Sequence, residues 1–132
     1  MPTLILTLTP PQTPDRCQAL ARALTDLTVQ RLGKRREVTA VAINQLPSGQ
    51  WHIGGEPAAQ PTALLEISIT EGTNTPQEKA AFIAAAFAEL AQQLAPGAAL
   101  ARASYVVVRE LPAQDWGYGG VTQLARRQAL PV

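Results

Sequence analysis

The stretches QWHIGGEP at residues 50–57 and DWGYGGVT at residues 115–122 share the pattern Trp-x-x-Gly-Gly and lie 65 residues apart. The segments upstream of the two copies also follow one common order, so the chain of 132 residues contains an internal repeat. We therefore predict one domain over residues 1–132. It comprises repeats at about 2–57 and 63–120, followed by a C-terminal tail at 121–132.

Each repeat is predicted to begin with a strand that leads into a helix. In the first repeat, Leu4, Leu6 and Leu8 alternate with Thr3, Ile5, Thr7 and Thr9, which is typical of a strand. Thr13 followed by Pro14 is a helix start, and Gly33 marks the helix end. The apolar residues of this helix recur at helical spacing: Cys17, Leu20, Leu24 and Leu27. A second strand is expected over residues 37–46.

The second repeat shows the same signals in the same order. A strand is predicted over residues 63–70, NTPQEK at 74–79 repeats the cap-then-proline signal, and a second strand is predicted over 103–111. The helix between them ends at Pro96 and Gly97. Its apolar stripe consists of Ile83, Phe87, Leu90 and Leu94, widened by Phe82 and Ala86.

A helical crossover makes the two strands of each repeat parallel and right-handed. Two such repeats related by a pseudo-twofold axis predict an α+β fold, a two-layer sandwich with one four-stranded mixed sheet and two helices on one face. The other sheet face carries Thr3, Ile5 and Thr7, which is too apolar to stay in water. We expect this face to pack against other copies of the chain in a closed ring.

Composition excludes several functions. A formal charge of +1 gives no electrostatic basis for binding nucleic acid or an anionic membrane. One cysteine rules out an internal disulfide and fits a reducing compartment. The start lacks the signals of a targeting segment and no eighteen apolar residues run together, so we expect a cytoplasmic protein. We also expect no cofactor.

The chain begins Met-Pro, and a small second residue favours removal of the initiator methionine. Pro2 would then carry a free secondary amine at the start of a strand. Burial in an apolar pocket lowers the pKa of such an amine toward the range of a general base. The alternative is that Pro2 simply begins an edge strand, a position that proline tolerates.

The proline-initiated strand, the Thr-Pro helix start and GQWHIGGE at 49–56 together resemble the tautomerase superfamily, typified by 4-oxalocrotonate tautomerase. The doubled pattern is similar to members that fuse two β-α-β units and form trimers. The tail from Asp115 is similar in layout to malonate semialdehyde decarboxylase, and ALARALTDL at 19–27 to cis-3-chloroacrylic acid dehalogenase. The tautomerase- and macrophage migration inhibitory factor-like (MIF-like) fold and a homotrimer are therefore implied.

The resemblance implies that Pro2 is the catalytic residue. It places an aromatic residue beside the proline, and Trp116 is the better candidate because the second repeat covers the first repeat's amine. Tyr118 is expected next to Trp116, while Trp51 would line a pseudo-site near Ala63. Both tryptophans can also serve as packing residues of their hairpins.

The substrate-binding arginines of these relatives are missing. Their positions correspond to Gln12, to Thr73 or Asn74, to Ala40 and to Tyr105, and the acid that activates water in the decarboxylase corresponds to Val38. Arg109 shares a strand face with Tyr105, so it is either a substrate contact or part of an intersubunit ion pair. Further cations are Arg126 and Arg127, and residues 34–36, which we interpret as a solvated turn. The proposed substrate-binding set is Trp116, Tyr118, Arg109, Tyr105, Asn74 and Thr73.

The remaining polar residues are not expected to form a functional site. His52 alternates with apolar neighbours in a hairpin and is interpreted as a surface residue. Glu71, Glu110 and Asp115 are isolated, so we predict no metal site.

Three functions stay open from the sequence. The first is an isomerase of tautomerase type that uses Pro2 as general base on a small enol or 2-oxo acid. The second is a hydratase, dehalogenase or decarboxylase in which Pro2 stays protonated. The third is a tautomerase fold without catalysis that binds a ligand or assembles with a partner.

Overall fold

The computed structural model describes residues 2–129, and its core is a four-stranded sheet in the order β2-β1-β5-β6. The bounds of these strands are β1 Thr3–Thr9, β2 Ala40–Gln45, β5 Thr62–Thr70 and β6 Tyr105–Leu111. The pairs β1–β2 and β5–β6 are parallel, and the central pair β1–β5 is antiparallel. The predicted mixed sheet is therefore confirmed.

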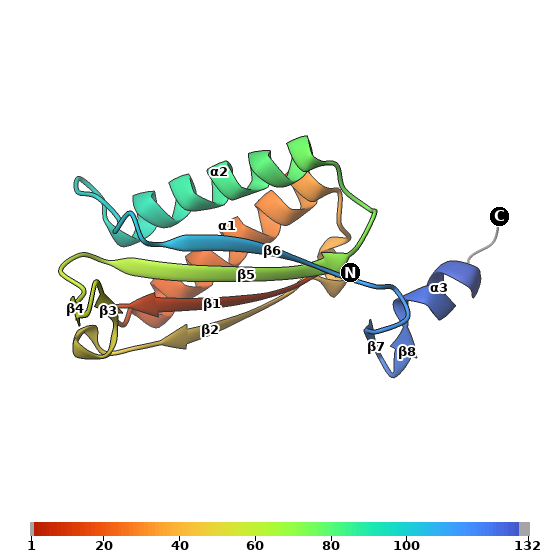
Figure 1. The fold of residues 1–132 in the computed structure, drawn as a ribbon, viewed down its shortest axis with the longest axis horizontal. Helices are drawn as coiled ribbons and strands as arrows, with labels where there is room; N and C mark the ends of the chain where they lie inside the picture. Colours follow the sequence, from red (N-terminus) through yellow and green to blue (C-terminus); the bar gives the residue numbers. More distant parts are fainter. Residues whose placement is uncertain (1, 130–132) are drawn as a thin grey trace.

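Helices α1 (Pro14–Leu32) and α2 (Pro76–Leu94) both cover one face of this sheet (Figure 1). The Thr13 hydroxyl caps α1 by accepting from the backbone N–H of Arg16 at 3.2 Å. Thr75 and Glu78 cap α2 reciprocally, each side chain accepting from the other residue's backbone N–H. Gly33 ends α1 in the left-handed region at φ 67°, which glycine adopts without strain.

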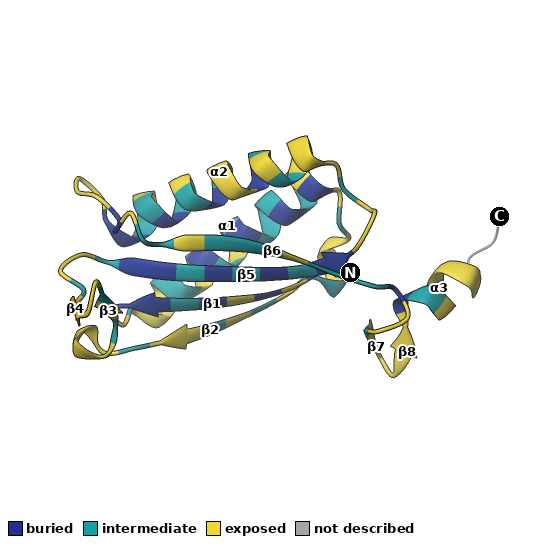
Figure 2. Cartoon of the chain, in the orientation of Figure 1, coloured by how far each residue is buried: buried dark blue, intermediate teal, exposed yellow. Residues whose placement is uncertain are grey.

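The core lies between this sheet face and the helices (Figure 2). The fully buried residues of β1 and β5 on this face include Leu4, Leu6, Leu8, Leu65, Ile67 and Ile69. On α2 the buried residues are Phe82, Ala86, Leu90 and Leu94. Ile83, which we placed on the buried stripe, is 38% exposed. The stripe is centred on Phe82 because this large side chain, one residue earlier, occupies the interior position.

Strand β2 is shorter than the predicted 37–46, because Arg36–Val38 forms the 3₁₀ turn η1. The ladder starts at Ala40, whose N–H donates to the Pro2 carbonyl at 3.4 Å. Proline has no N–H to return, so pairing ends at this point.

Two small hairpins extend from the sheet. The first consists of β3 (His52–Ile53) and β4 (Glu56–Pro57), which come after the 3₁₀ turn η2 (Ser48–Gln50). The second consists of β7 (Gly117–Tyr118) and β8 (Val121–Thr122). The tail continues as a short helix, α3 (Gln123–Ala129), which the sequence did not predict. No helix within residues 2–129 combines the length and the apolar character needed to cross a membrane.

Candidate active site

Pro2 is buried immediately before β1, a central strand of the sheet, and lines a recess of about 290 Å³. We call this cavity the Pro2 recess. It lies where the start of β1, the turn before β2 and the second hairpin meet, and its walls are mostly apolar. The main lining residues are Pro2, Val38, Ala40, Trp116, Tyr118 and Gln123.

Trp116 is held in the recess from both its backbone and its ring. Its indole Nε1 donates to the hydroxyl of Thr70, at the end of β5, over 3.2 Å. Its carbonyl accepts from the N–H of Gln123 at 2.9 Å. Because β1 and β5 are antiparallel, Thr70 lies at the same end of the sheet as Pro2. The second repeat therefore brings its tryptophan to the first repeat's proline.

Tyr118 is fixed by Arg126 of α3. The guanidinium carbon of Arg126 lies 3.8 Å from the centre of the Tyr118 ring, and its Nη2 donates to the Tyr118 carbonyl at 2.9 Å. A cation stacked on an aromatic face in this way contributes about 0.5–2 kcal/mol. The contact joins the hairpin to the tail helix.

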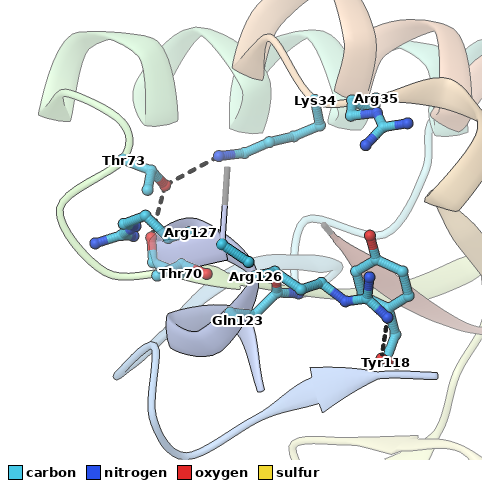
Figure 3. A pocket seen from close by; sticks show the side chains of 9 residues that line it. Lys34, Arg35, Thr70, Thr73, Tyr118, Gln123, Arg126 and Arg127 are labelled. Carbon is cyan, nitrogen blue, oxygen red and sulfur yellow. Dashed lines mark hydrogen bonds between the residues drawn. The ribbon is translucent and has the colours of Figure 1, made fainter. Parts of the chain in front are cut away.

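A second and larger cavity adjoins the Pro2 recess, with Tyr118 and Gln123 lining both. We call it the basic cavity. Its volume is about 390 Å³, and Figure 3 shows its charged side chains around the open space. Its principal lining residues are Lys34, Arg35, Thr73, Gln123, Arg126 and Arg127.

Lys34 is half-buried in this cavity, which differs from the solvated turn that we interpreted for residues 34–36. Its Nζ donates to the Thr73 hydroxyl at 2.9 Å (Figure 3). Burial lowers the pKa of the Lys34 ammonium, while the charges of Glu78 and Glu110 oppose that shift. Arg36 of the same run is exposed and pairs with Asp26.

Gln123 is a residue of interest that the sequence did not reveal. Its side chain is only 9% exposed, and its Nε2 has no hydrogen-bond partner. The Nε of Arg126 is also buried without a partner. Their spacing of three residues puts both side chains on one face of a helix, so predicting α3 would have exposed the pair.

The structure separates the remaining predicted site residues. Thr73 lines the basic cavity, whereas Asn74 donates from Nδ2 to the Leu32 carbonyl at 3.0 Å and ties the loop to α1. Tyr105 is 63% exposed on the open sheet face and pairs with Leu64, toward the far end of the sheet. Arg109 lies on that face too, with its guanidinium 3.4 Å from Glu66. Neither Tyr105 nor Arg109 lines the Pro2 recess or the basic cavity of its own chain.

Two family positions, Val38 and Ala40, do line the Pro2 recess. Neither side chain can bind an anion or activate a water molecule. His52 is exposed on the first hairpin. Within residues 2–129, no three His, Cys, Asp or Glu side chains are grouped so that they could hold a metal ion.

Trp51, which we predicted near a pseudo-site, belongs to the other end of the sheet. A cavity of about 170 Å³ lies there, lined by residues that include Thr9, Pro10, Ala58 and Pro61. We call it the far cavity. Neither Trp51 nor Ala63 is among its lining residues, and Ala63 is fully buried.

The fold and the repeat define a two-unit β-α-β protein, and comparisons show which proteins it resembles. The family model described as "Tautomerase enzyme" matches residues 2–60, which cover the first repeat. The whole chain is similar in fold to tautomerases with two fused repeats. A search of curated proteins returned no match.

Solved structures extend the likeness to nearly the whole chain. The symmetric wild-type trimer of Q0 fused 4-OT is 26% identical, with a TM-score of 0.81 over 94% of this chain and 98% of that one. N1, a member of the cis-3-chloroacrylic acid dehalogenase family, is 20% identical, with a TM-score of 0.78 over 98% and 92%. Pt0534, inactivated by 2-oxo-3-pentynoate, is 20% identical, with a TM-score of 0.78 over 94% and 98%.

Proposed function

We propose that this protein is a tautomerase-type isomerase in which the nitrogen of Pro2, freed by removal of Met1, is the general base for a small enol or 2-oxo acid. The observation that carries the proposal is the burial of Pro2 in an apolar recess beside Trp116 and Tyr118. The match of residues 2–60 to the tautomerase family model and the likeness in fold to fused 4-OT support it.

The recess suits a nitrogen that must be neutral at working pH. Apolar walls disfavour the protonated amine, and the cations of the adjoining basic cavity act in the same direction. In ketonisation of an enol, the nitrogen accepts the O–H proton and a proton is delivered to carbon. One O–H bond breaks, one C–H bond forms, and no electrons leave the substrate.

The proline ring also limits the motion of the base. The closed ring and the hydrogen bond that its carbonyl accepts from the Ala40 N–H hold the nitrogen in one position. Trp116 and Tyr118 exclude water from the reacting atoms. Val38, at the family's water-activating position, makes hydration chemistry the weaker alternative.

Replacing Pro2 tests the proposal directly. Pro2→Ala should reduce turnover of enolpyruvate by at least about 10²-fold, the lower end for a lost general base. Pro47→Ala, at an exposed loop proline, is the matched control and should retain full activity. Intact mass spectrometry should find Met1 absent. Unchanged turnover in Pro2→Ala, or a retained Met1, would refute the assignment.

Labelling and titration separate the alternatives. 2-Oxo-3-pentynoate, which inactivated Pt0534, should add once to this chain, and peptide mapping should locate the adduct on Pro2. Titration of the prolyl nitrogen by NMR should find it neutral at pH 7. A nitrogen protonated at pH 7 would favour the hydratase, dehalogenase or decarboxylase alternative. Absence of both labelling and turnover would favour a fold without catalysis.

We also propose that three chains assemble through the open sheet face, as in the fused 4-OT trimers. This face exposes Ile5 (41%) and Tyr105 (63%), and their apolar surface favours contact with another subunit. Light scattering should report a trimer, and Ile5→Glu should shift it toward monomer. A monomeric native protein would contradict this assembly.

A further inference from the structure

Positively charged side chains dominate the lining of the basic cavity. Four cationic side chains line it (Lys34, Arg35, Arg126 and Arg127), and no carboxylate does among residues 2–129. Within the same residues, only Arg35 of the four has a carboxylate at salt-bridge distance, that of Glu37 at 2.8 Å. The other three, Lys34, Arg126 and Arg127, can therefore interact with a ligand in the cavity.

Two residues that line the cavity each carry a buried hydrogen-bond donor without a partner. The Gln123 amide is nine-tenths buried and its Nε2 donates to nothing, and the same holds for the buried Nε of Arg126. An unsatisfied buried donor costs about 1–3 kcal/mol, so an acceptor that reached both atoms would be favoured. Oxygen atoms that carry negative charge are the acceptors that suit such donors best.

The cavity is rigidly built on its tail side. Stacking on Tyr118 fixes the guanidinium of Arg126. On the opposite wall, Thr73 accepts from Lys34 and donates to the Thr70 carbonyl at 2.6 Å (Figure 3). The Lys34 ammonium is thus hydrogen-bonded to a neutral partner, while Glu78 and Glu110 act on its charge without forming a salt bridge to it.

We propose that the basic cavity binds the dianionic end of the substrate, a phosphate monoester or an oxyanion of equal charge, through Lys34, Gln123 and Arg126. The inference rests on the proposed function and names its substrate class: an enol or 2-oxo compound whose reacting carbon lies at Pro2. Tyr118 and Gln123 line both cavities, so one ligand can span them. Three unmatched cations favour a dianion over a single carboxylate.

Anion binding in the basic cavity also compensates for the missing arginines. At Val38 and Ala40 the Pro2 recess presents apolar side chains, so it cannot grip an anion itself. The cations instead come from the segment after α1 and from the tail helix. The anion contact has moved to the adjoining cavity.

Calorimetry on the full chain at low ionic strength tests the charge preference, with inorganic phosphate and acetate as probes. Phosphate should bind at least about tenfold more tightly than acetate. Lys34→Met and Gln123→Glu should each weaken phosphate binding about tenfold, the equivalent of one hydrogen bond to a charged group. Arg102→Gln removes an exposed cation elsewhere and is the matched control. Equal affinity for acetate, or no loss in either variant, would overturn the proposal.

Two further measurements keep the result interpretable. Arg127→Gln changes an exposed position, so it removes charge without risk to the fold and should weaken phosphate binding about threefold. Phosphate should also raise the pKa of the prolyl nitrogen, because a nearby anion favours the charged amine. Phosphate binding that leaves the pKa of the prolyl nitrogen unchanged would show that the basic cavity is not part of the substrate site. Binding that persists in Pro2→Ala while Met1 proves to be retained would refute the proposed function alone.

Discussion

The two ends of the sheet derive from equivalent residues, yet only one carries a candidate site. The Pro2 end has Trp116 bonded to Thr70, the Pro2 recess and the basic cavity. The Ala63 end has Trp51 and the far cavity, whose lining residues carry no charge. Thr9 corresponds there to Thr70, but its buried hydroxyl has no partner.

The difference arises from the segment that each hairpin leads into. After the first hairpin, the chain passes directly into β5 at Thr62. After the second, it is free to form α3, which supplies Gln123, Arg126 and Arg127. The repeat therefore gives the sheet two equivalent ends, and helix α3 adds charged and polar side chains to only one of them.

The largest effect is expected from Gly117, which corresponds to His52 in the first hairpin. A Cβ at Gly117 would lie 2.0 Å from the Val121 carbonyl oxygen, so Gly117→Ala must open the β7–β8 hairpin. Because a misplacement of about 1 Å can cost 10²-fold, turnover of enolpyruvate should fall by about that factor. His52→Ala should leave turnover unchanged. Full activity in Gly117→Ala would show that the hairpin does not shape the Pro2 recess.

A smaller effect is expected from the two tryptophans. Trp116→Phe keeps an aromatic ring but removes the indole donor to Thr70, and turnover should fall about tenfold. Trp51→Phe should change turnover by less than about twofold, since Trp51 lines neither cavity next to Pro2. Steady-state kinetics on both variants makes the comparison. Equal losses would mean that the two hairpins contribute alike.

Much of the fold could be predicted from the sequence because its signals are local. Thr13 and Thr75 cap the two helices as predicted, and the alternation around Leu6 marks β1. The meeting of Pro2 and Trp116 in one recess followed from the pseudo-twofold arrangement, in which the antiparallel pair β1–β5 puts the two at one end.

The basic cavity could not be predicted in this way. Lys34 and Arg126 are far apart in sequence, and their approach depends on a helix of only seven residues. Thr122 caps this helix by accepting from the Ala125 N–H at 3.0 Å, but a single threonine without an apolar stripe is a weak helix signal. The unpaired amide of Gln123 is a property of tertiary packing alone. Such contacts leave no periodic signal in one sequence.

Thr70 and Thr9 are equivalent residues at the two ends of the sheet, and their replacement should affect stability differently. Thr70→Val leaves the Trp116 indole without its acceptor and should lower the free energy of unfolding by about 1 kcal/mol. Thr9→Val removes a buried hydroxyl that has no partner, so it should be neutral or slightly stabilising. Urea denaturation measures both. A larger loss in Thr9→Val would contradict the asymmetry of the two ends.

The smallest effect concerns an ion pair present in only one repeat. Lys79 Nζ donates to Glu110 at 2.8 Å, while the corresponding residues of the first repeat are Cys17 and Gln45. The hydrogen bond from Lys79 lowers the pKa of the Glu110 carboxyl below 4.5. A carboxylate with a lowered folded-state pKa stabilises the protein above pH 4.5, and this contribution is lost as the pH falls through the folded value.

Lys79→Met should therefore lower the free energy of unfolding by about 0.5–1 kcal/mol at pH 7, and the difference from the native chain should shrink below pH 4.5. Glu110→Gln, which recreates the residue found at Gln45, completes a double-mutant cycle, and the coupling should vanish at the same acidic pH. A difference that persists unchanged at pH 3 would assign the effect of Lys79 to its aliphatic packing on α2. The charge asymmetry between the two repeats would then have no bearing on stability.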